Sequence, residues 1–135
     1  MTVLNDALAG EHAAIFGYGV LGAHLTGPAL ALARQAEAAH RSRRDALLIS
    51  MASASPAPPA AALAYTLPFP VNDQASALRL ATGIEERTGE VWKAVLPGGG
   101  GDDRRRALDA LTDCALRAAR FRRAAGQAPG TVPLP

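Results

Sequence analysis

The chain has 135 residues, of which 49% are hydrophobic but only 4% aromatic, and its formal net charge at pH 7 is +2. A single cysteine excludes an internal disulfide, and no uncharged apolar run reaches about 18 residues, so a membrane-spanning helix is not predicted. The net charge is too small to indicate nucleic-acid binding on its own. A chain of this length fits one domain. The opening residues carry acids and no basic cluster, unlike a signal peptide, and we therefore expect a cytoplasmic protein.

Much of the apolar content is alanine, and the abundance of Ala, Leu and Arg favours helix over sheet. The first predicted helix spans about residues 3–25, with Thr2 or Asn5 as its cap. The sequence TGP at 26–28 then ends it, because Gly suits a helix C-terminus and Pro suits the first turn of a new helix. The second predicted helix spans about residues 28–52.

A long connection follows over about residues 53–71, and its five prolines exclude regular helix. Fully extended, about 18 residues reach roughly 55 Å, whereas a helix of about 25 residues is roughly 37 Å long. The connection is therefore long enough to cross the whole length of a helical bundle. The third predicted helix spans about residues 72–96 and has Asn72 or Asp73 as its cap.

The glycine-rich sequence PGGGGDD makes the next turn, and the fourth predicted helix spans about residues 103–125, capped by Asp102 or Asp103. Residues 126–135 are rich in Pro and Gly and predict a loose tail. Two short turns and one long connection predict an all-α, four-helix bundle over residues 1–125, built from two antiparallel hairpins joined by a Pro-rich crossover.

Charged residues occur in the middle of otherwise apolar stripes, formed by positions alternately three and four apart, that are expected to face the bundle interior. Glu11 is the sole charge in the stripe of the first helix, and Glu85 is the sole charge in that of the third. The second helix places Glu37, His40 and Arg44 in the middle of its stripe. Counted from the turns, these positions meet in one central layer. Buried carboxylates are costly without partners, so this layer needs cations or protons.

Four segments carry a resemblance to a known family: EHAAIFGYGVLGAHL at 11–25, EAAHRSRRDAL at 37–47, LPFPVND at 67–73 and DCALRAARFRRAAGQ at 113–127. The chain resembles the ferritin-like superfamily, and more closely a small actinobacterial family of uncharacterised ferritin-like domains, over nearly its whole length. The resemblance implies a ferritin-like bundle, often dimeric, with Glu on the first and third helices and Glu-x-x-His on the second and fourth. It implies no known activity, because none is assigned to that family.

The fourth predicted helix departs from the family pattern, because its nearest candidates are Asp113 and Leu116 and the second histidine is absent. The metal ligands that the resemblance carries over are Glu11, Glu37, His40 and Glu85. One histidine and three carboxylates suit a single Fe, Mn or Zn ion rather than a full di-iron centre. We assign no catalytic residue, and any activity at such a site would be that of a metal-dependent oxidoreductase.

The alternative is a buried ionic network in a non-catalytic structural or interaction module. Arg44 lies one turn after His40 and can pair with a carboxylate from a facing helix, while a protonated His40 neutralises another. Tyr18 lies in the same stripe as Glu11, where we predict core packing with its hydroxyl hydrogen-bonded. Asp113 falls on an arginine-rich face that is typical of solvated ion pairs.

The remaining features predict packing rather than chemistry. Cys114 sits among alanines with no nearby histidine, so we expect a small buried hydrophobe. GYGVLG at 17–22 offers small residues for close helix contact, and Trp92 is expected to anchor the core or a dimer. The arginines interleave with aspartates, which favours local pairing over nucleic-acid binding. We expect a homodimer, with neither a membrane nor a nucleic acid as partner.

Overall fold

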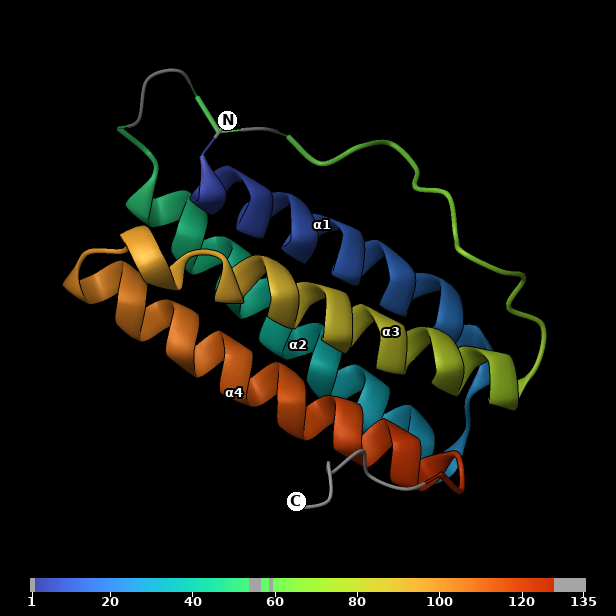
Figure 1. Ribbon diagram of the computed structural model, residues 1–135. Coiled ribbons are helices and arrows are strands. Elements are labelled where there is room, and N and C mark those ends of the chain that lie inside the picture. Colours follow the sequence, from blue (N-terminus) through green and yellow to red (C-terminus); the bar gives the residue numbers. More distant parts are fainter. Residues whose placement is uncertain (1, 54–56, 59, 128–135) are drawn as a thin grey trace, which may run out of the picture.

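The computed structural model describes residues 2–53, 57–58 and 60–127, and within these ranges every regular element is helical (Figure 1). The α-helices are α1 (Val3–Leu21), α2 (Gly27–Ser50), α3 (Gln74–Lys93) and α4 (Gly101–Ala124), and the 3₁₀ turns η1 (Gly22–His24) and η2 (Leu96–Gly98) follow α1 and α3. The prediction of an all-α protein with four helices is confirmed for this part of the chain. The part of the predicted tail that follows Gln127 lies outside the described residues.

α1 begins at a side-chain cap and ends earlier than predicted. The Thr2 hydroxyl accepts a hydrogen bond from the Asn5 backbone N–H at 3.1 Å, which satisfies one of the amides left free at a helix start. The α-helix stops at Leu21, and η1 tightens the next turn, as is common where the last carbonyls of a helix need donors. Leu25 is extended, yet its side chain still enters the core.

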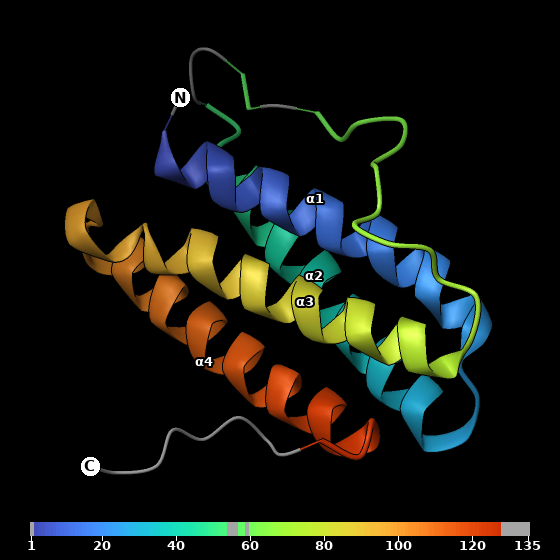
Figure 2. The same cartoon turned by 45° about the vertical axis from the view of Figure 1, so that its right-hand side comes forward.

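Gly27 makes the short turn between α1 and α2 possible. Its φ of 57° lies in the left-handed region, which glycine adopts without a steric penalty. Pro28 follows in the first turn of α2, where its missing N–H breaks no helical hydrogen bond. The tight turn lets α2 return alongside α1, as Figures 1 and 2 show.

α3 begins with a capping box. The Asp73 carboxylate accepts the Ser76 backbone N–H at 2.8 Å, and the Ser76 hydroxyl accepts the Asp73 backbone N–H at 3.2 Å. α4 begins at Gly101, slightly earlier than predicted, and has no side-chain cap. Asp102 and Asp103 lie instead in its first turn, where negative charge interacts favourably with the helix dipole.

From residue 60 onward, the segment between α2 and α3 lies along the outside of the bundle. It passes beside α1 toward the start of α3 (Figures 1 and 2). The Tyr65 ring lies 5.3 Å, centroid to centroid, from the ring of Phe16 in α1. Leu67 and Phe69 pack against the core. These contacts explain why the apolar sequence YTLPFPV is held against the helices.

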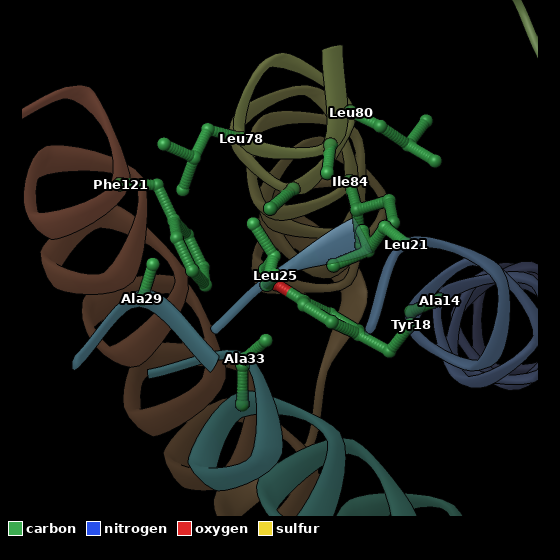
Figure 3. Packing of buried hydrophobic residues seen from close by; sticks show 13 residues of the cluster. Ala14, Tyr18, Leu21, Leu25, Ala29, Ala33, Leu78, Leu80, Ile84 and Phe121 are labelled. Carbon is green, nitrogen blue, oxygen red and sulfur yellow. The ribbon is translucent and has the colours of Figure 1, made fainter. Parts of the chain in front are cut away.

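Two apolar clusters divide the interior of the bundle. The first, shown in Figure 3, comprises Ala14, Tyr18, Leu21, Leu25, Ala29, Ala33, Ala36, Ala77, Leu78, Leu80, Ala81, Ile84 and Phe121. The second comprises Ala7, Leu8, Leu47, Met51, Trp92, Val95, Ala107 and Ala110. Trp92 is therefore part of the core. Along each of the first three helices, one buried ionisable residue separates the two clusters: Glu11 in α1, His40 in α2 and Glu85 in α3.

Candidate functional site

Glu11, His40 and Glu85 form a polar layer between the two apolar clusters, and each is 0% exposed. Nδ1 of His40 lies 2.8 Å from Oε1 of Glu11, and Nε2 of His40 lies 2.7 Å from Oε2 of Glu85. A carboxylate only accepts hydrogen bonds, so both ring nitrogens are placed to donate. Both donate together only when the imidazole is protonated.

The surroundings of His40 favour its charged form. Burial alone would lower the pKa of the imidazole, but the hydrogen bonds to Glu11 and Glu85, together with their negative charges, outweigh burial and raise the pKa to about 9. His40 is therefore a cation at pH 7 and neutralises one of the two buried carboxylates next to it.

Tyr18 adds a further donor to this layer. Its hydroxyl donates to Oε2 of Glu85 at 2.5 Å, and its ring stacks beside the His40 imidazole with the centroids 5.6 Å apart. Burial first, and then the charge of Glu85, raise the pKa of Tyr18 well above its usual value. The hydroxyl stays protonated and hydrogen-bonded inside the core, where Figure 3 shows the ring.

Arg43 extends the layer from α2 to α4. Its Nη1 lies 3.3 Å from Oε2 of Glu11, and its Nη2 lies 2.7 Å from Oδ2 of Asp113. Nε of Arg117 donates to the same Asp113 oxygen at 2.9 Å. Although partial burial acts to raise the pKa of Asp113, Arg117 and Arg43 lower it below its usual value. Asp113 is thus a bridge between two arginines rather than a residue of a solvated face.

We call this connected set the central network. It consists of Glu11, Tyr18, His40, Arg43, Glu85, Asp113 and Arg117. Its three carboxylates are balanced by two guanidinium groups and one imidazolium, so the network is neutral when His40 is protonated. Every helix of the bundle contributes at least one member, and charge is buried here only with a partner, as the cost of desolvation requires.

Two residues predicted for this layer lie outside it. Glu37 is partly exposed and accepts a hydrogen bond from Arg41 at 2.9 Å, and Arg44 pairs with Asp45 at 2.9 Å. Their predicted placement in the layer is wrong, because the inward face of α2 is rotated relative to the assumed stripe. The buried positions of α2 are Ala29, Ala33, Ala36, His40 and Leu47.

Arg43 and Arg117 are the members that sequence reasoning missed. Arg43 lies between His40 and Leu47 at the three-and-four spacing of the buried face, and this spacing could have identified it. Cys114, one residue after Asp113, is buried as expected for a small apolar side chain. Burial, followed by the charge of Glu85, raises the pKa of its thiol, which disfavours the nucleophilic thiolate.

The donor set does not suit a metal ion in this arrangement. Both nitrogens of His40 are engaged by carboxylates, so neither is directed at an open position for a metal. Glu37 pairs with Arg41 instead of joining Glu11 and Glu85. Over the part of the chain that the structure describes, no group of three or more His, Cys, Asp and Glu residues is placed to hold a metal ion.

The fold and its centre define a class: a protein whose described residues form four α-helices and no strand, around a buried network of histidine, carboxylate and arginine side chains. Residues 3–135 match the family described as Domain of unknown function (DUF4439), and the chain belongs to that family. The chain is similar to the crystal structure of a conserved hypothetical protein, rv2844, from Mycobacterium tuberculosis, with 38% sequence identity and a TM-score of 0.86. That match covers 90% of this chain and 93% of the other.

No curated protein matches the chain. Within the described residues, each helix is too short or too polar to cross a membrane.

Proposed function

We propose that this chain is a ferritin-like, non-catalytic binding module whose centre is a structural ionic network. The observation that carries the proposal is the position of His40, which donates from one ring nitrogen to Glu11 and from the other to Glu85. Ferritin-like ancestry is supported by where these residues stand, since Glu, His and Glu occupy the middle of α1, α2 and α3. In this chain, the side chains at these positions hold the helices together through ion pairs.

The network has a physical role without any metal or substrate. It connects all four helices at mid-height, and removing one partner of a buried ion pair typically costs about 3–5 kcal/mol, because the other charge is left uncompensated. Only one register of the four helices pairs all of these charges, and any other register would leave a buried charge without a partner. Because this role needs neither a metal nor a substrate, we propose a structural or binding module rather than a catalyst.

The protonation state of His40 tests the proposal directly. In ¹⁵N-labelled protein at pH 7, both imidazole nitrogens of His40 should show the chemical shifts of an imidazolium, and the ring should lose its proton near pH 9. Glu11→Gln should lower this pKa, because it removes a charged hydrogen-bond acceptor. Glu37→Gln is the matched control and should leave the pKa unchanged. A neutral His40 at pH 7 would contradict the proposal.

A single bound metal ion is the second candidate, and the resemblance to ferritin-like proteins favours it. That candidate requires Glu37, whereas the ionic network does not. The protein is loaded separately with Fe²⁺, Mn²⁺ and Zn²⁺, and the bound metal is measured by elemental analysis. We expect only traces of metal, at the same level in Glu37→Gln. One ion per chain that is lost in Glu37→Gln would establish the metal centre and overturn the network proposal.

A further inference from the structure

The outer side of α4 carries an apolar stripe that is exposed in the described part of the chain. Leu108 and Leu116 are 45% and 51% exposed, although a leucine side chain gains free energy on burial. We call the following set the outer stripe: Leu108, Thr112, Ala115, Leu116 and Ala119. The buried positions of α4 are a different set: Ala107, Ala110, Cys114, Ala118 and Phe121. A helix at the surface of a bundle needs only one apolar face, so the outer stripe indicates a second packing partner.

The spacing of the outer stripe is suited to contact with another helix. Four of its members follow one another at intervals of four, three and four residues: Leu108, Thr112, Ala115 and Ala119. Such spacing is typical of helices that pack against each other along their length. α4 contacts α3 and α2 with its inner side and lies at the edge of the bundle (Figures 1 and 2). The helix that would cover the outer stripe is therefore not one of the other described helices of the same chain.

A second copy of α4 in antiparallel orientation complements the outer stripe in shape. A two-fold axis through the middle of the stripe passes between Thr112 and Ala115. A two-fold interface brings residue i of one copy to residue j of the other, and j to i. Leu108 of one copy then comes to the level of Ala119 of the other, and the reverse contact follows by symmetry. A large side chain thus meets a small one on both sides of the axis, which suits interdigitation at a helix contact.

The charges beside the outer stripe also match an antiparallel copy. Asp109 and Arg120 are both exposed, and neither forms an ion pair with a residue that the structure describes. They are eleven residues apart, or about three helical turns, so both lie on the side of α4 that carries Leu116. In an antiparallel pair these sides face each other, and Asp109 of one copy comes within roughly 3 Å, along the axis, of Arg120 of the other. Two symmetric ion pairs therefore form across the contact.

The same charges disfavour a parallel pair. That orientation brings Asp109 to the level of Asp109 and Arg120 to the level of Arg120, so like charges meet. In the antiparallel pair, Arg105 of one copy and Arg123 of the other come to similar levels, but Arg105 is already paired with Asp102 at 3.3 Å. Helices that cross at an angle also diverge toward their ends, which weakens this repulsion. Charge complementarity therefore favours the antiparallel orientation.

We propose that two copies of this chain associate through the outer stripes of α4 as an antiparallel, two-fold symmetric helix pair. The apolar side chains supply the contact, and Asp109 and Arg120 set its orientation. A contact between two helices buries less surface than the roughly 800 Å² per partner of a standard stable interface, so we expect a dissociation constant of about 10 μM. The contact uses no residue of the central network and is therefore independent of the proposed function.

Sedimentation equilibrium of the full chain at pH 7, from about 1 to 300 μM, measures the association. We expect the mass to rise from monomer to dimer and no higher, because a two-fold contact closes on itself. Leu116→Asp should raise the dissociation constant more than about 100-fold, since it replaces an apolar side chain by a charge at two symmetric positions. Leu63→Asp is the matched control, because Leu63 is also an exposed leucine but lies in the connection between α2 and α3, and this variant should associate like the unmodified chain.

Charge reversal tests the antiparallel orientation. Asp109→Arg places arginine opposite arginine at both symmetric positions, and Arg120→Asp places aspartate opposite aspartate. Each variant alone should associate about tenfold more weakly than the unmodified chain. An equal mixture of the two variants restores both ion pairs in a mixed dimer, whose dissociation constant should return to within about threefold of the original value.

Far-UV circular dichroism first shows that each variant is folded, as expected for changes at exposed positions. A chain that stays monomeric at the highest concentration, or an equal loss of association in Leu63→Asp and Leu116→Asp, would overturn the proposal. So would a mixture of the charge-reversed variants that associates no better than either alone. The imidazolium signals of His40 should be unchanged in Leu116→Asp, so a failure of this inference leaves the central network standing and is distinguishable from a failure of the proposed function.

Discussion

The imidazole of His40 holds its proton between two buried carboxylates, and this position sets how the stability of the fold responds to pH. The pKa of His40 is about 9 in the folded chain, against an ordinary value of 6.5. A raised pKa in the folded state gives stability that is fully present below the unfolded value and is lost as the pH rises through the folded value. Its expected contribution is on the order of 3 kcal/mol.

We therefore predict that the free energy of unfolding falls by about 3 kcal/mol between pH 6 and pH 10, mostly between the two pKa values. Urea denaturation followed by far-UV circular dichroism at several pH values measures this change. His40→Gln should lose most of the pH dependence in this range, whereas His24→Gln, a change at a partly exposed residue, should retain it. A flat stability profile in the unmodified chain would contradict the pKa assignment.

Glu11 and Glu85 were predictable from the sequence, because each is a lone charge among bulky apolar residues at helical spacing. Bulky residues define the inward face of a helix, so a charge that falls in line with them is expected to be buried. Asp113 was harder to place, since it stands among arginines and looks like part of a solvated face. Only the fold brings Arg43 close enough to make it a partner of Asp113.

At the scale of the helix, α2 shows why the rest of the site was missed. Alanine occurs on both its inward and outward faces, and alanine gives little information about burial. Two stripes therefore fit the sequence about equally well. Both contain Ala33, His40 and Leu47, but between these positions one passes through Glu37 and Arg44 and the other through Ala36 and Arg43. The structure selects the second stripe, because Ala36 is 0% exposed while Glu37 pairs with Arg41.

The contact between α1 and α3 depends on a small residue, and two glycines in α1 form a matched pair that tests it. A Cβ on Gly17 would lie 2.5 Å from Ile84 Cδ1, whereas a Cβ on Gly19 would have nothing within 4 Å. Gly17→Ala should destabilise the protein by about 1–3 kcal/mol through overpacking. Gly19→Ala should stabilise it by roughly 0.5–1 kcal/mol through helix propensity.

Urea midpoints of the two variants measure these opposite effects. Both substitutions add the same methyl group to the same helix, so the difference between them isolates the contact with α3. Equal stabilisation by both would mean that Ile84 moves aside at no cost and that close approach of α1 and α3 is unimportant.

At the scale of the whole molecule, the order of helices was predictable because prolines and glycines mark the breaks between them. The Pro-rich connection and the turns at Gly27 and after Lys93 separate four helical segments, and the described residues form four α-helices. Helix ends were less predictable, since α1 gives way to the 3₁₀ turn η1 at Gly22, inside the predicted first helix, and α3 ends at Lys93, before the predicted end near residue 96.

The central network joins both apolar clusters into one unit, and we predict that the protein unfolds in a single transition. Trp92 lies in the second cluster and reports on it by fluorescence, whereas far-UV circular dichroism reports on all helices. The two signals should give the same urea midpoint, because the layer between the clusters cannot stay intact when either side opens. Separate midpoints would show that the clusters unfold independently and that the network does not couple them.

The distribution of charge in the network also differs between the two halves of the chain. The half formed by α1 and α2 contributes one acid, Glu11, and two cations, His40 and Arg43, while the half formed by α3 and α4 contributes two acids, Glu85 and Asp113, and one cation, Arg117. The halves therefore attract one another across the interior, and two copies of the same half repel. Electrostatic attraction therefore favours pairing of the α1–α2 half with the α3–α4 half during folding, and repulsion disfavours pairing of two identical halves.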